Sequence, residues 1–166
     1  MIQEDEKILV RDLSSRLPYG VRGTVPVEVA SGHYDVYDGS MLYDEKEILV
    51  ELVGIGDGGE IEVLILEDGW KDYDLSDYDF TLDDFTPYLR PMSSMTEEEK
   101  GEINDIIIEF GNRWFDAEDA DGHWSATFWE SSEIVDYLNA HHFDYRGLIE
   151  KGLAIEVTEE NNPYDN

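Results

Sequence analysis

The chain opens with apolar residues at the spacing of a helix. Leu9, Leu13 and Leu17 recur every fourth residue, so they fall on one side of a helix with 3.6 residues per turn. The ring of Pro18 disfavours helical angles at the residue before it. The pattern therefore predicts a short amphipathic helix over residues 4–16, followed by a turn at the sequence PYG.

Strand-like alternation follows the helix. Valine occupies every second position from Val25 to Val29, and Pro26 between them cannot donate to a ladder, which predicts a strand near a sheet edge. The pair Asp38 and Gly39 suits the left-handed angles of a two-residue type I′ turn, so the flanking segments YDVY and SMLY are expected to form a hairpin. The segments EILVELV and EIEVLIL predict two more strands.

Helical spacing returns in the second half of the chain. Thr96 and Glu99 match the capping box Thr-x-x-Glu, in which each side chain bonds the other residue's backbone N–H. The apolar face that follows is formed by Ile103, Ile106, Ile107 and Phe110. After a polar loop expected over residues 116–125, a second stripe is formed by Ile134, Tyr137, Leu138 and His141. Both stripes predict helices.

The last segments complete the fold class. A third, shorter helix is expected over residues 145–151 with Gly152 as its stop, and LAIEV is expected to return to the sheet as a strand. Successive strands with short connections favour an antiparallel meander or a small curled sheet. We expect one acidic α+β domain over residues 1–158, with an N-terminal helix, a small antiparallel sheet and two or three C-terminal helices, and a mobile tail over residues 159–166.

Charge constrains the partners. The 166 residues include 41 acids and 11 bases, a formal net charge of −30, yet 41% are hydrophobic, which is too many for a wholly solvated chain. Nucleic acid and anionic membranes would repel this charge, so we expect direct binding to neither. The expected partner is a basic protein surface.

Composition also bounds the compartment and the chemistry. Without cysteine the chain has no disulfide, thiolate metal site or cysteine nucleophile, which is compatible with a reducing cytoplasm. The opening MIQEDEKILVRDL lacks the basic region of a signal peptide, and nowhere do 18 apolar residues run together. We expect a soluble, cytoplasmic protein.

Two ligand motifs are present only in part. Residues 54–59 match G-x-G-x-x-G, but the strand pattern EIEVLIL follows where a dinucleotide site needs a helix, so a hairpin turn is favoured. Residues 117–122 align with the first half of an EF-hand loop, but its first and twelfth positions would be Ala117 and Phe128, neither of which is a carboxylate. We expect no cofactor and no metal site.

Catalytic residues cannot be singled out. The histidines are His33, His123, His141 and His142, and none has the i, i+4 partner of a zinc-binding helix. On the apolar stripe, a half-buried His141 with a local hydrogen bond is favoured over a ligand or a general base. Two carboxylates could do acid–base work only at a fixed separation in a cleft. We expect a protein that is not an enzyme, with a carboxylate-based enzyme as an alternative.

The segment DGWKDYDLSDYDFTLDDF, residues 68–85, is the candidate site. Tryptophan and tyrosine give large contact areas with little entropy loss, and aspartates speed the encounter with a basic surface. The predicted partner-binding residues are Asp68, Trp70, Asp72, Tyr73, Asp74, Asp77, Tyr78, Asp79, Asp83 and Asp84, with Phe80 and Phe85 as further anchors. In the alternative, the aromatic rings pack inward and the aspartates face water.

Acids elsewhere in the chain suggest a use for the whole surface. A rigid anionic body can imitate the phosphate array of a nucleic acid and occupy the basic groove of an enzyme such as a nuclease. One alternative is an interaction module that binds a basic protein without imitating DNA, and another is a surface that only aids solubility. Mimicry needs carboxylates exposed in rows at phosphate-like spacing, whereas a module needs one compact patch around the aromatic residues.

Three segments carry a resemblance: DLSSRLPYGV at residues 12–21, PYLRPMSSMTEEE at 87–99 and LNAHHFDYRGLIEKGLAIE at 138–156. Together they cover about a quarter of the chain and resemble an uncharacterised family of small proteins encoded by phages and mobile elements of gut bacteria. The resemblance implies the cytoplasm of a bacterial host. By analogy with other small acidic phage proteins, it also implies an inhibitor of a defence nuclease, such as an anti-CRISPR protein or a DNA mimic, but no particular site residues.

Overall fold

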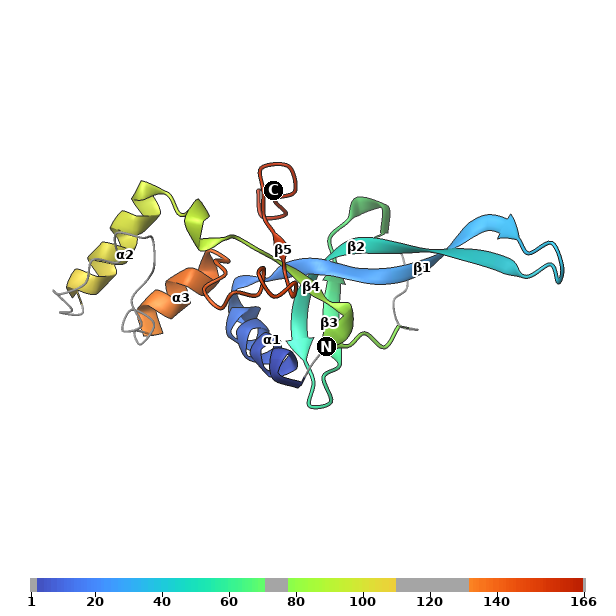
Figure 1. The fold of residues 1–166 in the computed structure, drawn as a ribbon, viewed down its shortest axis with the longest axis horizontal. Helices are drawn as coiled ribbons and strands as arrows, with labels where there is room; N and C mark the ends of the chain where they lie inside the picture. Colours follow the sequence, from blue (N-terminus) through green and yellow to red (C-terminus); the bar gives the residue numbers. More distant parts are fainter. Residues whose placement is uncertain (1–2, 71–77, 110–131, 166) are drawn as a thin grey trace. The chain divides into compact units, whose positions relative to one another are not determined.

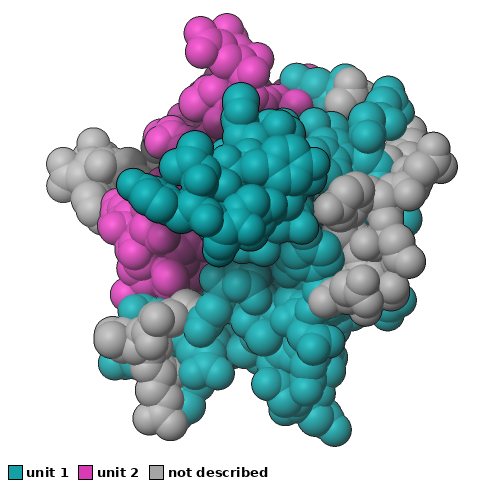
Figure 2. Space-filling model, turned by 90° about the vertical axis from the view of Figure 1, so that its right-hand side faces the viewer, with its two compact units in different colours: residues 1–88, 163–166 teal, residues 89–162 magenta. Residues whose placement is uncertain are grey.

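A computed structural model of the chain describes residues 3–70, 78–109 and 132–165. They form two compact units, which we call unit 1 (Met1–Tyr88 with Pro163–Asn166) and unit 2 (Leu89–Asn162) (Figure 2). Unit 1 therefore takes its residues from both ends of the chain. The single domain expected over residues 1–158 and the motion of residues 159–166 stay predictions.

The secondary structure confirms the α+β class. The helices are α1 (Gln3–Arg16), α2 (Glu97–Glu109) and α3 (Ser132–Ala140), and the strands are β1 (Arg22–Tyr34), β2 (Met41–Ile55), β3 (Ile61–Ile65), β4 (Thr86–Leu89) and β5 (Ile155–Glu156) (Figure 1). The sheet order is β3-β2-β1-β4-β5, and the pairs of β1 with β2, β1 with β4 and β2 with β3 are antiparallel. The meander of β1, β2 and β3 matches the predicted strand succession.

The core of unit 1 combines α1 with the sheet. Leu9 and Leu13 of the predicted stripe are 2% and 0% exposed, and Val25, Ile48 and Val50 of the strands are equally buried. Burying side chains of this size stabilises the fold by about 1.5–3 kcal/mol each. The helix predicted from apolar spacing is thus confirmed, since that spacing gives α1 a face for this core.

A buried ion pair stabilises the end of α1. Asp12 and Arg16 are 0% exposed and lie one helical turn apart. Arg16 donates from Nε to Asp12 Oδ2 at 2.6 Å and from Nη2 to Oδ1 at 3.1 Å. Two parallel hydrogen bonds offset much of the cost of removing both charges from water.

Strand β1 changes from an interior strand to an edge strand along its length. Strand β4 pairs with it only at Gly23 and Thr24. The ring of Phe85 lies so close to Gly23 that an added Cβ would come within 2.5 Å of its Cζ. Pro26 lies beyond the part of β1 that β4 covers, so its missing N–H interrupts no ladder. The prediction that Pro26 marks an edge therefore agrees with the register.

The β1–β2 hairpin forms, but the predicted type I′ turn at Asp38 and Gly39 is wrong. That turn needs positive φ at both residues, and only Gly39 has it, at 73°. The connection is longer: Asp35 N–H donates to the Ser40 carbonyl at 2.8 Å, and Asp35 Oδ1 accepts from Tyr37 N–H at 2.7 Å. A hydrogen bond from Ser40 N–H lowers the pKa of Asp38. Hydrogen bonds that the aspartate side chains accept from backbone N–H groups favour this wider turn.

The G-x-G-x-x-G motif at residues 54–59 covers the end of β2 and most of the hairpin turn between β2 and β3. Gly56 N–H donates to the Glu60 carbonyl at 2.7 Å, and Gly59 N–H donates to the Gly56 carbonyl at 3.1 Å. Gly59 has φ of 86°, an angle that few other residues adopt. The predicted hairpin turn is confirmed, because strand β3 follows these glycines.

Unit 2 contains the predicted capping box. Thr96 N–H donates to Glu99 Oε2 at 2.8 Å, and Glu99 N–H donates to Thr96 Oγ1 at 3.2 Å. Arg90 adds a bidentate pair to the same carboxylate, at 2.7 and 3.1 Å. Partial burial raises the pKa of Glu99, but the hydrogen bonds from Arg90 and Thr96 outweigh it and hold the pKa below its ordinary value.

The core of unit 2 is formed by residues of both predicted stripes and their neighbours. Its buried members are Met95, Ile103, Ile107, Ile134, Leu138 and Phe143. His141 is half-buried, its Nδ1 lies 2.9 Å from the Tyr137 carbonyl oxygen, and its ring stacks on that tyrosine. The expectation of a locally bonded histidine is confirmed.

The third helix predicted over residues 145–151 is wrong, because turns occupy this segment. The Asp144 carboxylate accepts from the N–H groups of Leu148 and Ile149 at 2.8 Å each, and Gly147 has φ of 70°. A residue in left-handed conformation ends helical geometry. The returning strand is confirmed as the short β5, next to which Val157 N–H donates to the Leu89 carbonyl at 2.8 Å.

Candidate functional site

The distal half of the β1–β2 hairpin has no buried residue. From Glu28 to Glu47 every side chain is exposed or half-buried, whereas the flanking Val27 and Ile48 are each 1% exposed. Figure 1 shows this two-stranded ribbon continuing past β3 and β4. We call residues 28–47 the arm. A surface reaching beyond the rest of the sheet is accessible to a partner from both faces.

The two most exposed large apolar side chains of the described residues lie at the tip of the arm. Val36 and Tyr37 are 88% and 95% exposed. Tyr34 and Tyr43 are each 60% exposed, and Leu42 is 44% exposed. A cluster of apolar side chains that face water is typical of an interaction surface. The tip can therefore supply aromatic anchors.

Carboxylates accompany one of these tyrosines on a single face. Glu28 lies opposite Glu45 in the ladder. Because residues two apart in a strand point to the same side, Glu47 and Tyr43 share that side with Glu45. We call the side with Tyr43, Glu45, Glu47 and Glu28 the acidic face. It places three carboxylates and one aromatic ring where a basic surface could meet them together.

Tyr78 connects the predicted segment to the arm. Its hydroxyl accepts from Glu28 N–H at 3.2 Å and donates to the Glu28 carbonyl at 3.1 Å. These two backbone groups belong to the outer edge of β1, past the residues that β4 covers. Tyr78 therefore has a role in the fold itself, as a cap on an open strand edge.

Two of the aromatic anchors predicted within residues 68–85 are core residues. Phe80 is 7% exposed and Phe85 is 2% exposed. Their prediction as anchors is wrong. The alternative, in which the aromatic rings pack inward, is correct for these two residues. Phenylalanine has no polar group to keep in water, so its ring gains most by joining the core.

The other predicted residues have several roles. Asp84 closes a capping box with Thr81, accepting from its N–H at 2.8 Å and its hydroxyl at 2.9 Å. Accessible to a partner are the exposed Asp68, Asp79 and Asp83 and the half-buried Trp70. Outside the described residues lie Asp72, Tyr73, Asp74 and Asp77. Partner binding by this segment stays a prediction.

The sequence predicted a hairpin at the arm but not a site. The segment YDVYDGSMLYDEKE has the same mixture of tyrosine and acids as residues 68–85, and this was the available signal. Whether the tyrosines of a hairpin are covered depends on how far the neighbouring strands reach. That reach is a tertiary property, which the alternation of residues in one segment does not contain.

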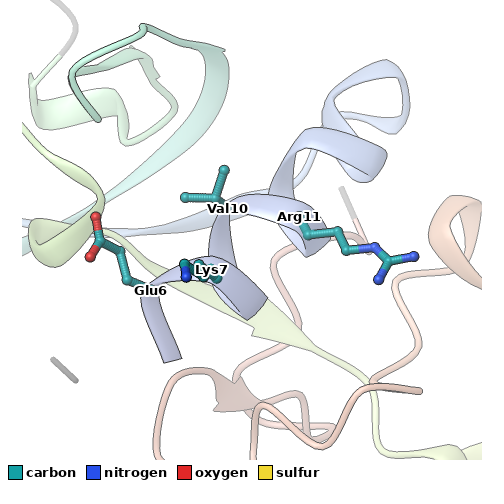
Figure 3. A pocket seen from close by; sticks show the side chains of 4 residues that line it. All are labelled: Glu6, Lys7, Val10 and Arg11. Atoms are coloured by element: carbon teal, nitrogen blue, oxygen red, sulfur yellow. The ribbon is translucent and has the colours of Figure 1, made fainter. Parts of the chain in front are cut away.

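Other chemistry in the described residues is limited. A hollow of about 290 Å³ is lined by Glu6, Lys7, Val10 and Arg11 of α1, and the charged ends of Glu6 and Arg11 point away from each other (Figure 3). Within the described ranges, no three acidic or histidine side chains gather as metal ligands. No described helix is long and apolar enough to cross a bilayer. The EF-hand-like loop and His123 lie outside these ranges.

Comparison of the chain with models of protein families, with curated proteins and with solved structures gives no match. The resemblance to proteins of phages and mobile elements stays a prediction. The arm and the charge of the chain are the features that bear on its function.

Proposed function

We propose that this protein is a non-enzymatic binding protein that attaches to a basic protein surface through the tip and the acidic face of the arm. The observation that carries the proposal is the combination of exposed Tyr37 and Tyr43 with Glu45 and Glu47 on one ribbon. Aromatic anchors inside a polar rim are the usual anatomy of a protein interface.

The net charge of −30 supports a basic partner. Long-range attraction raises the rate at which oppositely charged surfaces meet, and salt weakens it. The anchors then hold the complex by leaving water, a contribution that salt does not screen. Binding through the arm should therefore have both a salt-dependent and a salt-independent part.

The number of carboxylates in line favours a compact patch over a phosphate-like row. A DNA strand carries its charges without interruption along the axis, so a mimic needs a long, continuous row of carboxylates. On β2 the acidic face holds only Glu45 and Glu47 before it reaches Tyr43. These features support the interaction module more than strict mimicry of DNA.

Occupation of a basic nucleic-acid groove is the second candidate. It is favoured by the exposure of the charge: among the described carboxylates, only Asp12 and Asp144 are buried. A defence nuclease of a bacterial host, including a CRISPR effector, is the target class that the resemblance implies. On this proposal the exposed acids outside the arm would extend the contact along the groove.

Affinity capture from bacterial lysate tests the proposal. The wild type should retain a basic protein at low salt, and Tyr37→Ser or Glu45→Gln with Glu47→Gln should reduce its capture about tenfold, a loss expected of interface hot spots. Glu159→Gln with Glu160→Gln makes the same charge change outside the arm and should have little effect. Equal loss from both double variants would contradict the arm as the site.

Displacement separates the two candidates. Added duplex DNA should release a partner that is bound through its nucleic-acid groove. A partner that stays bound in excess DNA but requires the arm supports the module. Failure to enrich any basic protein would overturn both.

A further inference from the structure

Strand β3 covers only the near half of β2. Its residues pair with β2 from Ile55 to Val50, and Leu66 adds one bond, from its N–H to the Leu49 carbonyl at 3.0 Å. Glu67 Oε2 then accepts from Leu49 N–H at 3.4 Å. From Leu49 towards the tip, β2 continues without β3, so among the described residues nothing pairs with its outer edge along the arm.

The open edge has a defined set of backbone groups. In an antiparallel ladder, alternate residues turn their N–H and C=O towards one neighbour and then the other. Leu49 faces outward, because Leu66 and Glu67 bond to it. Counting by two along β2, the outward residues of the arm are Glu47, Glu45 and Tyr43. In the described part of the chain, no hydrogen bond reaches their outward groups.

The two edges of the arm differ in whether their backbone groups are covered. On β1, Pro26 has no N–H to offer and Tyr78 bonds both backbone groups of Glu28, which blocks the addition of a strand near the base. On β2, Glu45 and Glu47 have no such cover among the described residues. Their side chains belong to the acidic face, so the open backbone and the carboxylates coincide.

Resting on the proposed function, we propose that the outer edge of β2, residues 43–47, binds an extended basic segment of the partner as an added antiparallel strand. The segment would continue the line of β3 along β2. Its residues opposite Glu45 and Glu47 share their face, so lysine or arginine there would pair with both carboxylates. Alternating basic residues are therefore the recognition pattern.

A second copy of this chain is a poor occupant for the same edge. Antiparallel pairing of two β2 edges would bring Glu45 and Glu47 of one copy against the acidic face of the other. Directly opposed like charges destabilise strand pairs. The charge of the edge thus selects a basic strand and discourages self-association, a common protection of edge strands.

The probe is a short synthetic peptide in which lysine alternates with threonine. When lysines lie opposite Glu45 and Glu47, the backbone N–H groups of the lysines point at β2 and those of the threonines point away. Methylation of the lysine backbone nitrogens should weaken binding about tenfold or more, because carbonyls of the edge lose their donors. Methylation of the threonine nitrogens is the matched control and should change affinity less than about threefold.

Hydrogen exchange gives an independent readout. On binding the unmodified peptide, the amides of Tyr43, Glu45 and Glu47 should become protected. The amides of Asp44 and Lys46 already face β1 and should change little. If the peptide binds but the amides of Tyr43, Glu45 and Glu47 stay unprotected, strand addition is wrong.

Variants distinguish this inference from the proposed function. Glu45→Pro removes an outward N–H group from β2, just as Pro26 lacks one on β1. It should lower the affinity for the peptide more than Glu45→Gln does, because Glu45→Gln removes only the charge. If both variants weaken it equally and lysine methylation has no effect, strand addition is wrong while charge-driven binding by the arm stands. If neither variant affects the peptide or the lysate partner, both proposals fail.

Discussion

Glu28 and Glu45 lie directly opposite each other in the β1–β2 ladder. Their backbone groups point away from the partner strand, and in antiparallel pairs of this kind the side chains approach most closely. Two carboxylates at such a position repel each other and weaken the ladder. Their presence in the arm fits the binding of a basic partner better than it fits stability of the ladder.

Glu45→Lys should therefore stabilise the fold while damaging its proposed function. Replacing the repulsion by an attraction should raise the free energy of unfolding by about 0.5 kcal/mol, measured by urea denaturation. The gain should shrink in high salt. Glu159→Lys is the control for a general reduction in charge, and an equal gain there would contradict a local effect at Glu28.

Gly23→Ala should be strongly destabilising. The added Cβ would come within 2.5 Å of Phe85 and 2.6 Å of the Thr86 carbonyl oxygen, and overpacking of this kind costs about 1–3 kcal/mol. Gly101→Ala is the matched control, since its Cβ would meet nothing within 4 Å in helix α2. That variant should gain up to about 1 kcal/mol from helix propensity. Thermal unfolding of both variants would show shifts of opposite sign.

Arg90→Gln should weaken unit 2 in a pH-dependent way. The pKa of Glu99 is held below 4.5 in the folded state, so its contribution is present above the unfolded pKa and is lost as the pH falls through the folded pKa. The difference in unfolding free energy between wild type and variant should thus be largest above pH 4.5 and should decline in acid. A difference that is constant with pH would show that Arg90 acts through its packing on Phe143, 4.2 Å from the ring centre.

Tyr164→Phe should change stability in alkali. Burial raises the pKa of Tyr164 to about 12, so its contribution is full below the ordinary value of 10.0 and is lost as the pH rises through about 12. The variant should lose about 1 kcal/mol at neutral pH, since the hydroxyl donates to the Tyr88 carbonyl. Its further loss between pH 10 and 12 should be smaller than that of wild type. Tyr34→Phe, at an exposed position, is the control variant.

Local signals predicted the regular elements well. Leu9 and Leu13 lie four residues apart, and Thr96 and Glu99 of the capping box lie three residues apart. Because both signals are local, the sequence alone contains the reason for α1 and α2. The prediction of a helix at 145–151 is wrong because the Asp144 carboxylate accepts hydrogen bonds from the N–H groups of Leu148 and Ile149 in place of helical ones. Competition of this kind is not visible in apolar periodicity.

The candidate site depended on longer-range information. Residues 68–85 and the arm have similar composition, but Phe80 and Phe85 enter the core whereas Tyr37 and Tyr43 face water. What decides between them is the length of β3 and β4 relative to the hairpin. Both segments are rich in tyrosine and acid, and the register of the sheet explains why Tyr37 and Tyr43 of the hairpin stay exposed.

The hydroxyl of Tyr164 lies 2.9 Å from the Tyr88 carbonyl oxygen and accepts from Arg22 N–H at 3.1 Å. During synthesis, Arg22 and Tyr88 are added to the chain well before Tyr164. The sheet can pair during translation, but these closing contacts must wait until all of unit 2 has been synthesised. These contacts of unit 1 therefore form late in synthesis, and a nascent chain stalled before Pro163 would present the start of β1 without them.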